Sequence, residues 1–304
     1  MMLDCAVIGG GPAGLNAALV LGRSRRRTVL FDDNKPRNAV TQESHGFITR
    51  DGIDPQEFKR IGQDELSNYS DVRIEKQRVH RIKKEDGQYS VETESGEVFY
   101  AKKVILATGF KESLPDIPRV HEFYGKSLFG CPFCDGWEIR DRPLAVIAED
   151  QKAVHMAKLV SNWTDDLIVF TNGHHVISDE EKDLLSSVGI TVNEKKIVSL
   201  IGQGGQLEKI QLEDQTEVLR KGGFIASEWI QAATFESDLG YQLNEQGGIE
   251  TDSMQRTKTP GVFACGDTRI AGASQLIMAA SEGSMAAIAV NAELLEEKFN
   301  GMKM

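Results

Sequence analysis

The sequence of 304 residues is poor in cysteine and has no long apolar run. Its four cysteines include only one closely spaced pair, so they cannot form the disulfide framework of a secreted scaffold. No apolar run reaches the ~18 residues that a membrane helix needs, which excludes a membrane-spanning protein. The chain starts without the basic n-region, apolar h-region and cleavage site of a secretion signal, so we expect a cytoplasmic protein.

Basic residues are outnumbered by acidic ones: the chain has 35 Lys and Arg residues against 46 Asp and Glu residues, and its net charge is −11. Such a chain repels a phosphate backbone, so nucleic acid is not an expected partner. Hydrophobic residues make up 40% of the chain, which is ordinary for a globular protein. The length suits two domains, each able to bury a core of its own.

One cysteine pair stands near the middle of the chain, in the motif Cys-Pro-Phe-Cys-Asp-Gly at residues 131–136. Cys131 and Cys134 can close a small disulfide, and a helix starting at this point would lower the thiol pKa towards the reactive thiolate. Asp135 is then a candidate proton carrier. Half of a zinc site and two buried thiols are the alternatives, but zinc usually needs four ligands and no second CxxC or close Cys/His pair exists. The motif therefore favours a redox dithiol, whereas Cys5 and Cys265, in apolar stretches, are expected to be inert core thiols.

The first part of the chain has the pattern of a dinucleotide-binding unit. Residues 4–8 predict a buried strand, 9–14 a glycine turn of sequence GGGPAG, 15–21 a helix, and 27–31 a second strand that is followed by Asp32. An acidic residue about this far beyond a GxGxxG turn is typical of the dinucleotide fingerprint.

Each residue of this fingerprint has a physical role. Gly9 permits the tight turn, Gly11 lets the backbone approach a pyrophosphate, and Gly14 lets helix and strand pack closely, while the helix N-terminus attracts negative charge. Asp32 is expected to accept hydrogen bonds from the adenosine ribose hydroxyls.

The following segment is loop-rich and then changes to strands. Residues 35–54 are rich in turn residues, and 55–66 predict a helix. Short alternating runs between residues 72 and 100, the first of them at 72–74, suggest an antiparallel meander. They lead into a buried strand at 104–109 that ends in Ala-Thr-Gly.

This Ala-Thr-Gly strand, the opening fingerprint, the CxxC motif and the segment TPGVFACGD at 259–267 follow one another in the order of the low-molecular-weight thioredoxin reductases, and the sequence resembles that family. The resemblance implies an α/β fold with two Rossmann-like dinucleotide-binding-type domains, the second inserted in the first. It implies FAD as cofactor and a homodimer. The expected boundaries are an FAD-binding domain of residues 1–112 and 236–304, interrupted by a CxxC-bearing domain of residues 113–235.

The resemblance also assigns roles to individual residues. Cys131 would exchange with the external thiol or disulfide, Cys134 would face the flavin and pass on two electrons, and Asp135 would carry the proton. The residues expected to contact FAD are Gly9, Gly11, Pro12, Ala13, Gly14, Asp32, Asp33, Arg37, Asn38, His45, Thr108, Gly109, Gly266, Asp267, Ser274, Gln275 and Leu276.

The family pattern breaks where a second fingerprint should bind NADPH. After a predicted strand at 143–147 the two expected glycines are Ala148 and Asp150, and Glu149 stands between them. One like-charge contact with a phosphate at about 4 Å costs up to roughly 4 kcal/mol, close to a thousandfold in affinity. After the next strand, at 167–170, no arginine is present for the 2′-phosphate. His174 and His175 could weakly substitute, form part of a metal site or simply be solvated. NADPH is therefore not expected to bind in the usual way.

These departures resemble a divergent branch that includes FAD-dependent dithiol oxidases, which close disulfides in natural products such as gliotoxin and holomycin. In that branch electrons run from a substrate dithiol through the CxxC pair and FAD to dioxygen. The oxidases of that branch often carry a histidine at the position of Asp135, whereas the aspartate found here is the residue that thioredoxin reductases carry. Three functions stay open: a dithiol oxidase, a reductase of a small disulfide or a thioredoxin-like protein fed by NAD(P)H or ferredoxin, and a non-catalytic flavin-binding or sensing protein.

Overall fold

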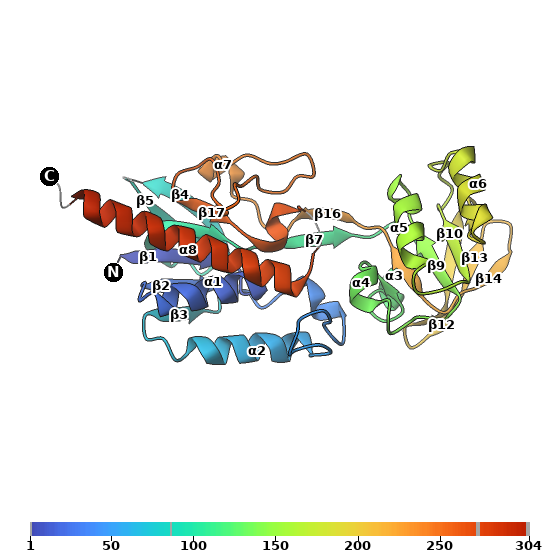
Figure 1. Ribbon diagram of the computed structural model, residues 1–304, viewed down its shortest axis with the longest axis horizontal. Coiled ribbons are helices and arrows are strands. Elements are labelled where there is room, and N and C mark those ends of the chain that lie inside the picture. The colour runs from blue at the N-terminus through green and yellow to red at the C-terminus, as the bar shows by residue number, and fades with distance from the viewer. Residues whose placement is uncertain (1, 86, 272–273, 302–304) are drawn as a thin grey trace. The chain divides into compact units, whose positions relative to one another are not determined.

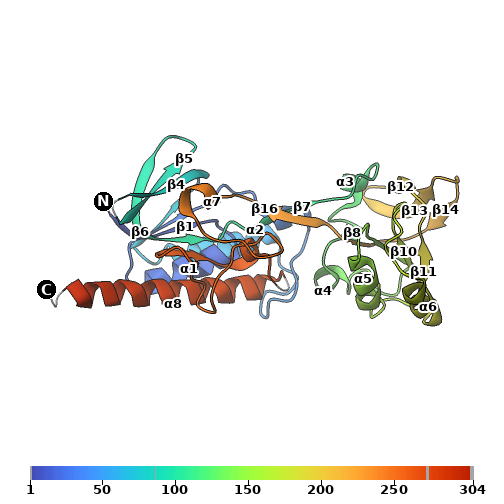
Figure 2. The ribbon, with the colours of Figure 1, turned by 90° about the horizontal axis from the view of Figure 1, so that it is seen from above.

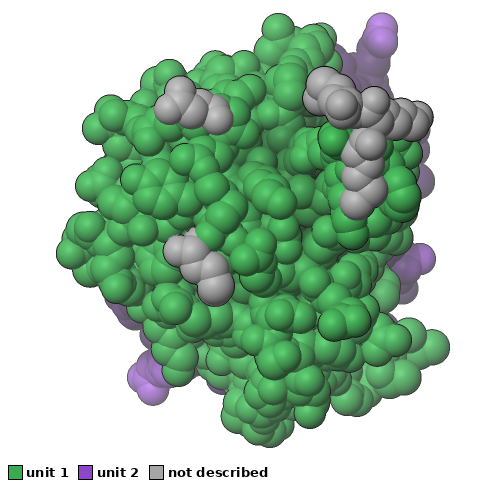
Figure 3. Space-filling model, turned by 90° about the vertical axis from the view of Figure 1, so that its left-hand side faces the viewer, with its two compact units in different colours: residues 1–39, 46–111, 229–304 green, residues 40–45, 112–228 purple. Residues whose placement is uncertain are grey.

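The computed structural model describes residues 2–85, 87–271 and 274–301. The chain divides into two compact units, which Figure 3 colours separately: unit 1 comprises residues 1–39, 46–111 and 229–304, and unit 2 comprises residues 40–45 and 112–228. The chain leaves unit 1 in strand β7 (Phe110–Ser113) and returns in β16 (Glu228–Gln231).

Unit 1 is built on one large mixed sheet. Its strand order is β3-β2-β1-β6-β5-β4, with β17 beside β6. The strands are β1 (Leu3–Ile8), β2 (Thr28–Phe31), β3 (Val72–Glu75), β4 (Val79–Glu85), β5 (Gln88–Thr93), β6 (Val98–Leu106) and β17 (Val262–Ala264). The helices are α1 (Pro12–Arg23), α2 (Pro55–Leu66), α7 (Glu236–Leu239) and α8 (Leu276–Gly301), with 3-10 turns η1 (Arg37–Val40) and η2 (Gly266–Arg269).

Both faces of this sheet are covered, because alternate residues of β1 point to opposite sides and each set packs into a hydrophobic core. Cys5 and Val7 pack into a core with α1 and α8, whereas Ala6 and Ile8 pack into a second core with β4, β5 and the segment around α7. Helices α1 and α8 lie side by side in both ribbon views (Figures 1 and 2), and Asn16 Nδ2 donates a 2.8 Å hydrogen bond to Ala280 O between them.

Two expectations for this region were wrong. The run at 72–74 is not part of an antiparallel meander but is β3, which pairs in parallel with β2, because α2 forms the crossover between these two strands. The last of the alternating runs, which ends at residue 100, and the predicted strand at 104–109 are largely one strand, β6, whose first half pairs with β5 and whose second half pairs with β17.

Unit 2 contains a five-stranded parallel sheet of order β11-β10-β9-β15-β8. Its strands are β8 (Leu128–Phe129), β9 (Leu144–Ile147), β10 (Leu167–Phe170), β11 (Thr191–Asn193) and β15 (Gly223–Ile225). The helices are α3 (Val120–Phe123), α4 (Pro132–Asp135), α5 (Lys152–Val160) and α6 (Asp179–Ser187). A separate antiparallel sheet consists of β12 (Ile197–Gln203), β13 (Gln206–Leu212) and β14 (Glu217–Leu219).

The polar residues of unit 2 that are candidates for the functional site directly follow its parallel strands. Cys131 comes soon after β8, Glu149 after β9, Asn172 after β10, Glu194 after β11 and Ser227 after β15. The carboxyl ends of parallel strands form one edge of the sheet, which is where open α/β sheets bind ligands.

Within the described part of the chain, the helices are all too short or too polar to traverse a bilayer. Nor do three His, Cys, Asp or Glu side chains gather into a metal-binding group anywhere in residues 2–85, 87–271 and 274–301.

Candidate active site

The glycine turn of residues 9–14, here called the first turn, lies between β1 and α1. Gly9 has φ +115°, its N–H donates to Phe31 O at 2.8 Å, and a Cβ on it would lie 2.1 Å from Ala107 O. A Cβ on Gly14 would lie 1.8 Å from Gly9 O, so no side chain fits at either position.

Gly11 differs from these two glycines because it borders open space. It is the N-cap of α1, and a Cβ on it would meet nothing within 4 Å. Pro12 is the first residue of the helix and lacks an N–H, and Ala13 is buried behind it. The first turn thus presents an accessible helix N-terminus, the arrangement that binds a pyrophosphate.

Asp32 is buried and already holds three partners. Its Oδ2 lies 2.5 Å from Lys59 Nζ and accepts from Gln63 Nε2 at 3.3 Å, and its Oδ1 accepts from the N–H of Asn34 at 3.0 Å. The exposed Asp33 accepts from Lys35 N at 3.2 Å. Lys59 was missed in the sequence, although Lys59 and Gln63 stand four residues apart on one face of a predicted helix.

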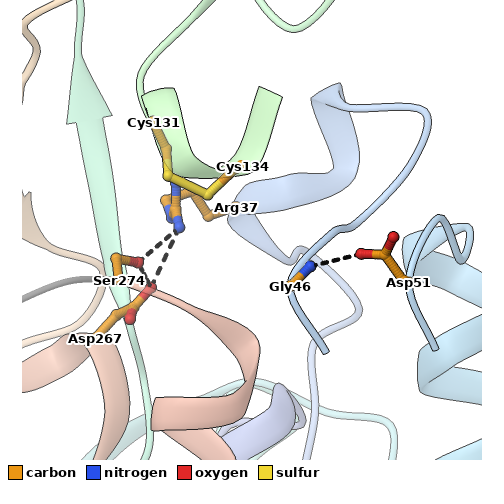
Figure 4. The surroundings of a disulfide bond; sticks show 7 residues. All are labelled: Arg37, Gly46, Asp51, Cys131, Cys134, Asp267 and Ser274. Carbon is orange, nitrogen blue, oxygen red and sulfur yellow. Dashed lines mark hydrogen bonds and ion pairs between the residues drawn. A yellow bond between two sulfur atoms is a disulfide. The ribbon is translucent and has the colours of Figure 1, made fainter. Parts of the chain in front are cut away.

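Three of the predicted FAD residues come together from distant segments. Arg37 Nη2 donates to Ser274 Oγ at 2.8 Å and lies 3.4 Å from Asp267 Oδ2, and Ser274 Oγ donates to the same Asp267 oxygen at 2.7 Å (Figure 4). The cluster combines a cation, a carboxylate and a hydroxyl group, which suits the phosphate and ribityl groups of a flavin nucleotide.

An aromatic wall adjoins this cluster and was not foreseen. The Arg37 guanidinium lies 4.6 Å from the centre of the Phe110 ring, and Phe110 stacks on Trp229 at 4.5 Å with 17° between the planes. Phe110, Trp229 and Asp267 line a shallow pocket that is partly open to solvent. The only sequence signal was the position of Phe110 directly after the Ala-Thr-Gly strand end.

For several other residues predicted to bind FAD, the structure gives a position but no contact that tests the predicted role. Thr108 Oγ1 lies 2.9 Å from Thr268 Oγ1, and Gly109 has φ +70°. Gly266 and Asp267 open η2, Asn38 lies in η1, Gln275 directly precedes α8 and Leu276 begins it. His45 belongs to unit 2, where its Nε2 lies 3.5 Å from Glu43 and 3.6 Å from Glu138. All these assignments stay predictions.

The residues of unit 1 fit FAD. The space beside Gly11 lies at a helix N-terminus that can receive the pyrophosphate, and the cluster of Arg37, Ser274 and Asp267 offers a donor and acceptors, the last two of these residues lining the pocket beside Phe110. These are the groups that would hold the cofactor.

Cys131 and Cys134 form a disulfide with a Cα–Cα distance of 5.3 Å (Figure 4). Cys131 is the N-cap of α4, and its carbonyl accepts from the N–H groups of Cys134 at 3.1 Å and Asp135 at 3.2 Å. Pro132 fixes the start of this turn because its φ is already helical. The side chain of Phe133 between them is exposed, with its ring edge-on to Trp163 at 5.8 Å. Cys131 and Cys134 themselves are half-buried.

The other two cysteines have no such access. Cys5 and Cys265 are fully buried, and burial raises the pKa of each thiol well above its ordinary value. Since the thiolate is the reactive form, both are inert, as the sequence predicted.

The second turn, residues 148–153 after β9, occupies in unit 2 the position that the first turn occupies in unit 1. Glu149 Oε1 accepts from Asn172 Nδ2 at 2.5 Å, and Asn172 Oδ1 accepts from Ile197 N at 2.8 Å. Asp150 accepts from the N–H of Lys152 at 2.9 Å. The carboxylates therefore cap their own turn and neighbouring loop.

A third carboxylate lies at the same sheet edge, after β11. Glu194 Oε2 lies 3.0 Å from Lys182 Nζ and 3.2 Å from Nδ1 of the exposed His175, and the Lys182 hydrogen bond lowers the pKa of Glu194. Lys182 and His175 are therefore already paired with a carboxylate of this chain, Glu194.

The fold and the dithiol define a class of protein, and comparison with known proteins agrees. The chain belongs to the pyridine nucleotide-disulphide oxidoreductase family, whose model matches residues 3–287. That class of thioredoxin reductase-like enzymes binds FAD, and this chain is an oxidoreductase of that kind.

Individual relatives narrow the resemblance. Thioredoxin reductase aclD of Aspergillus oryzae is 31% identical, with 96% of each chain covered. The crystal structure of a putative thioredoxin reductase TrxB from Bacillus anthracis is 46% identical, covers 97% of this chain and 99% of its own, and has a TM-score of 0.94. The crystal structure of HlmI is 34% identical, covers 99% and 95%, and has a TM-score of 0.93. The predicted family and the α/β thioredoxin reductase fold are confirmed.

Proposed function

We propose that this enzyme oxidises a dithiol at the Cys131–Cys134 pair, with FAD as cofactor and dioxygen as the electron acceptor, and that NADPH is not its electron donor. The contrast between the two turns carries the proposal. The first turn borders open space at Gly11, whereas the second turn has carboxylates at the positions that should meet phosphates.

The second turn opposes NADPH by charge. Asp150 stands where the first turn has Gly11, and Glu149 stands where it has Gly10. A phosphate brought to about 4 Å from one of these carboxylates loses up to roughly 4 kcal/mol, near a thousandfold in affinity. At the same sheet edge, Glu194 pairs with Lys182 and so occupies a cation that could otherwise meet a phosphate.

Thiol–disulfide exchange at the pair proceeds in two balanced steps. A substrate thiolate attacks Cys131 Sγ, the Cys131–Cys134 bond breaks, and Cys134 leaves as a thiolate. The second substrate thiol, after losing its proton, attacks the mixed disulfide and displaces Cys131. The substrate leaves as a disulfide and the enzyme keeps the electron pair as a dithiol.

Asp135, in the same turn as Cys134, would carry the protons released by the substrate. FAD, when bound, would accept the electron pair of the dithiol and deliver it to dioxygen, which with two protons gives hydrogen peroxide. The protein contributes the placement of the dithiol and the proton carrier.

Two substrate classes fit a half-buried pair next to an exposed phenylalanine: a small dithiol and the dithiol of a thioredoxin-like protein. The exposed ring of Phe133 offers either one an apolar contact beside the sulfur atoms. The homodimer implied by the resemblance stays a prediction, which the elution volume of the purified protein can test.

A disulfide reductase fed by ferredoxin or NAD(P)H is the second candidate. Asp135 favours it, because this position carries an aspartate in the thioredoxin reductases that the sequence resembles. In a reductase the same exchange steps run in reverse, so electron flow and not the geometry of the pair separates the two functions.

Oxygen consumption tests the proposal. Air-saturated enzyme given a small dithiol, or a reduced thioredoxin, should consume oxygen and form hydrogen peroxide in equal amounts, and Cys134→Ser should abolish both. No oxygen uptake with either dithiol would reject the oxidase. Turnover that survives Cys134→Ser would reject a role for the pair in the reaction, whereas the absence of turnover with every dithiol, disulfide and electron donor would leave the non-catalytic flavoprotein.

A further inference from the structure

Glu282 of α8 lines the pocket of unit 1 and binds the segment that carries Asp267. Its Oε2 accepts a 2.7 Å hydrogen bond from the N–H of Gly266, and its Oε1 accepts a 2.6 Å hydrogen bond from Arg269 Nη1. Gly266 and Arg269 are the first and last residues of η2, so one carboxylate holds both ends of this short turn. The sequence motifs assign no role to Glu282.

The backbone at Gly266 is closely constrained. Its φ is +73°, a conformation that favours glycine, and a Cβ on it would lie 2.8 Å from the Cβ of Ala13. The next residue is Asp267, whose Oδ2 accepts from Ser274 Oγ at 2.7 Å and lies 3.4 Å from Arg37 Nη2. The position of the Gly266 peptide therefore sets the point from which the Asp267 side chain reaches this cluster.

The same part of α8 also packs against the first turn. A Cβ on Gly283 would lie 2.0 Å from Ala13 O, so the backbones of α8 and of the start of α1 are in direct contact. Nearby, Asn16 of α1 donates to Ala280 O at 2.8 Å. Residues 280–283 thus hold the first turn and η2 together, although these two segments come from opposite ends of the chain.

We propose that Glu282 is a positioning residue for FAD. By holding the Gly266 N–H, it keeps Asp267 in place relative to the first turn, so that one FAD molecule can contact both. Both carboxylate oxygens are engaged with protein groups, and the residue therefore acts through Asp267. A hydrogen bond to an ionised acceptor is stronger than one between neutral groups, which suits this role. The inference rests on the assignment of FAD to unit 1 and is independent of the electron acceptor.

The experiment measures cofactor affinity and not turnover. Apoprotein of the parent and of each variant is titrated with FAD by flavin fluorescence, and its urea unfolding midpoint is measured without FAD. Glu282→Met is similar in length but lacks an acceptor, and it should weaken FAD binding about ten- to a hundredfold. Glu282→Gln keeps an oxygen for the Gly266 N–H and should retain FAD affinity to within about threefold. Both variants remove the same charge, so the difference between them reports the hydrogen bond.

Glu293→Met is the matched control. Glu293 lies about three turns further along α8 and pairs with Lys103 at 2.8 Å and Arg256 at 3.0 Å, outside the set of described residues that line the pocket. This variant should lower the unfolding midpoint of the apoprotein but change FAD affinity less than about twofold. If Glu282→Met does not fold, Glu282→Ala, which also lacks the acceptor, takes its place in the comparison with Glu282→Gln.

Three results would overturn the proposal: FAD affinity unchanged without the acceptor, an equal loss of affinity in Glu282→Gln, or an equal loss in Glu293→Met. A parent apoprotein that binds no FAD would reject the cofactor assignment together with this proposal. Because the titration contains no dithiol and no electron donor, failure of the oxidase proposal would leave its result intact. Failure of this proposal alone would leave oxygen uptake by the parent enzyme unaffected.

Discussion

The first and second turns have the same strand–turn–helix architecture, but the first turn is built of glycines whereas the second carries carboxylates at the matching positions. Each follows a buried parallel strand and precedes a helix, at residues 9–14 in unit 1 and 148–153 in unit 2. In the first turn Gly11 leaves open space at the helix start, while in the second turn Asp150 occupies the matching position and Glu149 bonds to Asn172. Under the proposed function, the strand–turn–helix scaffold of unit 2 persists without nucleotide binding, because strand and helix packing holds it without a ligand.

The largest effect is expected when the carboxylate of the second turn is introduced into the first turn by the substitution Gly11→Asp. Gly11→Asp adds a side chain where a Cβ meets no protein atom, so the fold should be kept. FAD affinity should fall by about a thousandfold, since the carboxylate would face the pyrophosphate. Titration of the apoprotein with FAD, followed by flavin fluorescence, measures it. Gly11→Asn, equal in size but neutral, should lose much less; an equal loss in both would assign the effect to bulk.

The ion pair behind the first turn predicts the next largest effect. Lys59→Met leaves the buried Asp32 without its cation and should lower the free energy of unfolding by about 3 kcal/mol in a urea titration. The double variant Lys59→Met with Asp32→Asn should recover part of this loss. If the double variant is no more stable than the single one, the pair is not what stabilises the site.

Removing the charges of the second turn should restore some nucleotide affinity. Glu149→Ala combined with Asp150→Gly should tighten NADPH binding by up to about a hundredfold, because the repulsion disappears while no arginine is gained for the 2′-phosphate. Calorimetry with NADPH and NADH measures the change, and Asp166→Asn, a charge removed elsewhere in unit 2, is the control. Unaltered binding in the double variant would mean that charge at the second turn is not the barrier.

The contact between Glu149 and Asn172 predicts the smallest effect. Asn172→Ala loses the hydrogen bonds to Glu149 and to the N–H of Ile197, and should cost about 2 kcal/mol of stability. Asn172 has φ +51°, so Asn172→Gly, which loses the same bonds without backbone strain, should cost less. Urea unfolding of both variants tests this order, and a more stable Asn172→Ala would contradict it.

Local signals in the sequence predicted the elements that carry the chemistry. The glycine spacing at 9–14 and the CxxC motif indicated the first turn and the dithiol, and the missing glycines at 148 and 150 indicated the altered second turn, because these features depend on residues close in the chain. The parallel pairing of β3 was missed because a short strand does not encode the direction of its partner.

Contacts between distant segments could not be predicted in the same way. Lys59 beside Asp32, Trp229 against Phe110 and Glu112 beside Gly130 each join residues that only the folded chain brings together. The helical spacing of Lys59 and Gln63 and the position of Phe110 after the Ala-Thr-Gly strand are weak signals, because neither names the partner that the folded chain supplies.

The most direct test of the central claim is an anaerobic mixing experiment with the purified holoenzyme. We predict that NADPH and NADH leave the visible absorption band of the flavin unchanged, that a small dithiol or a reduced thioredoxin bleaches it, and that admission of air restores it. Rapid bleaching by either nucleotide would contradict the account of the second turn and make the protein an ordinary nucleotide-dependent reductase.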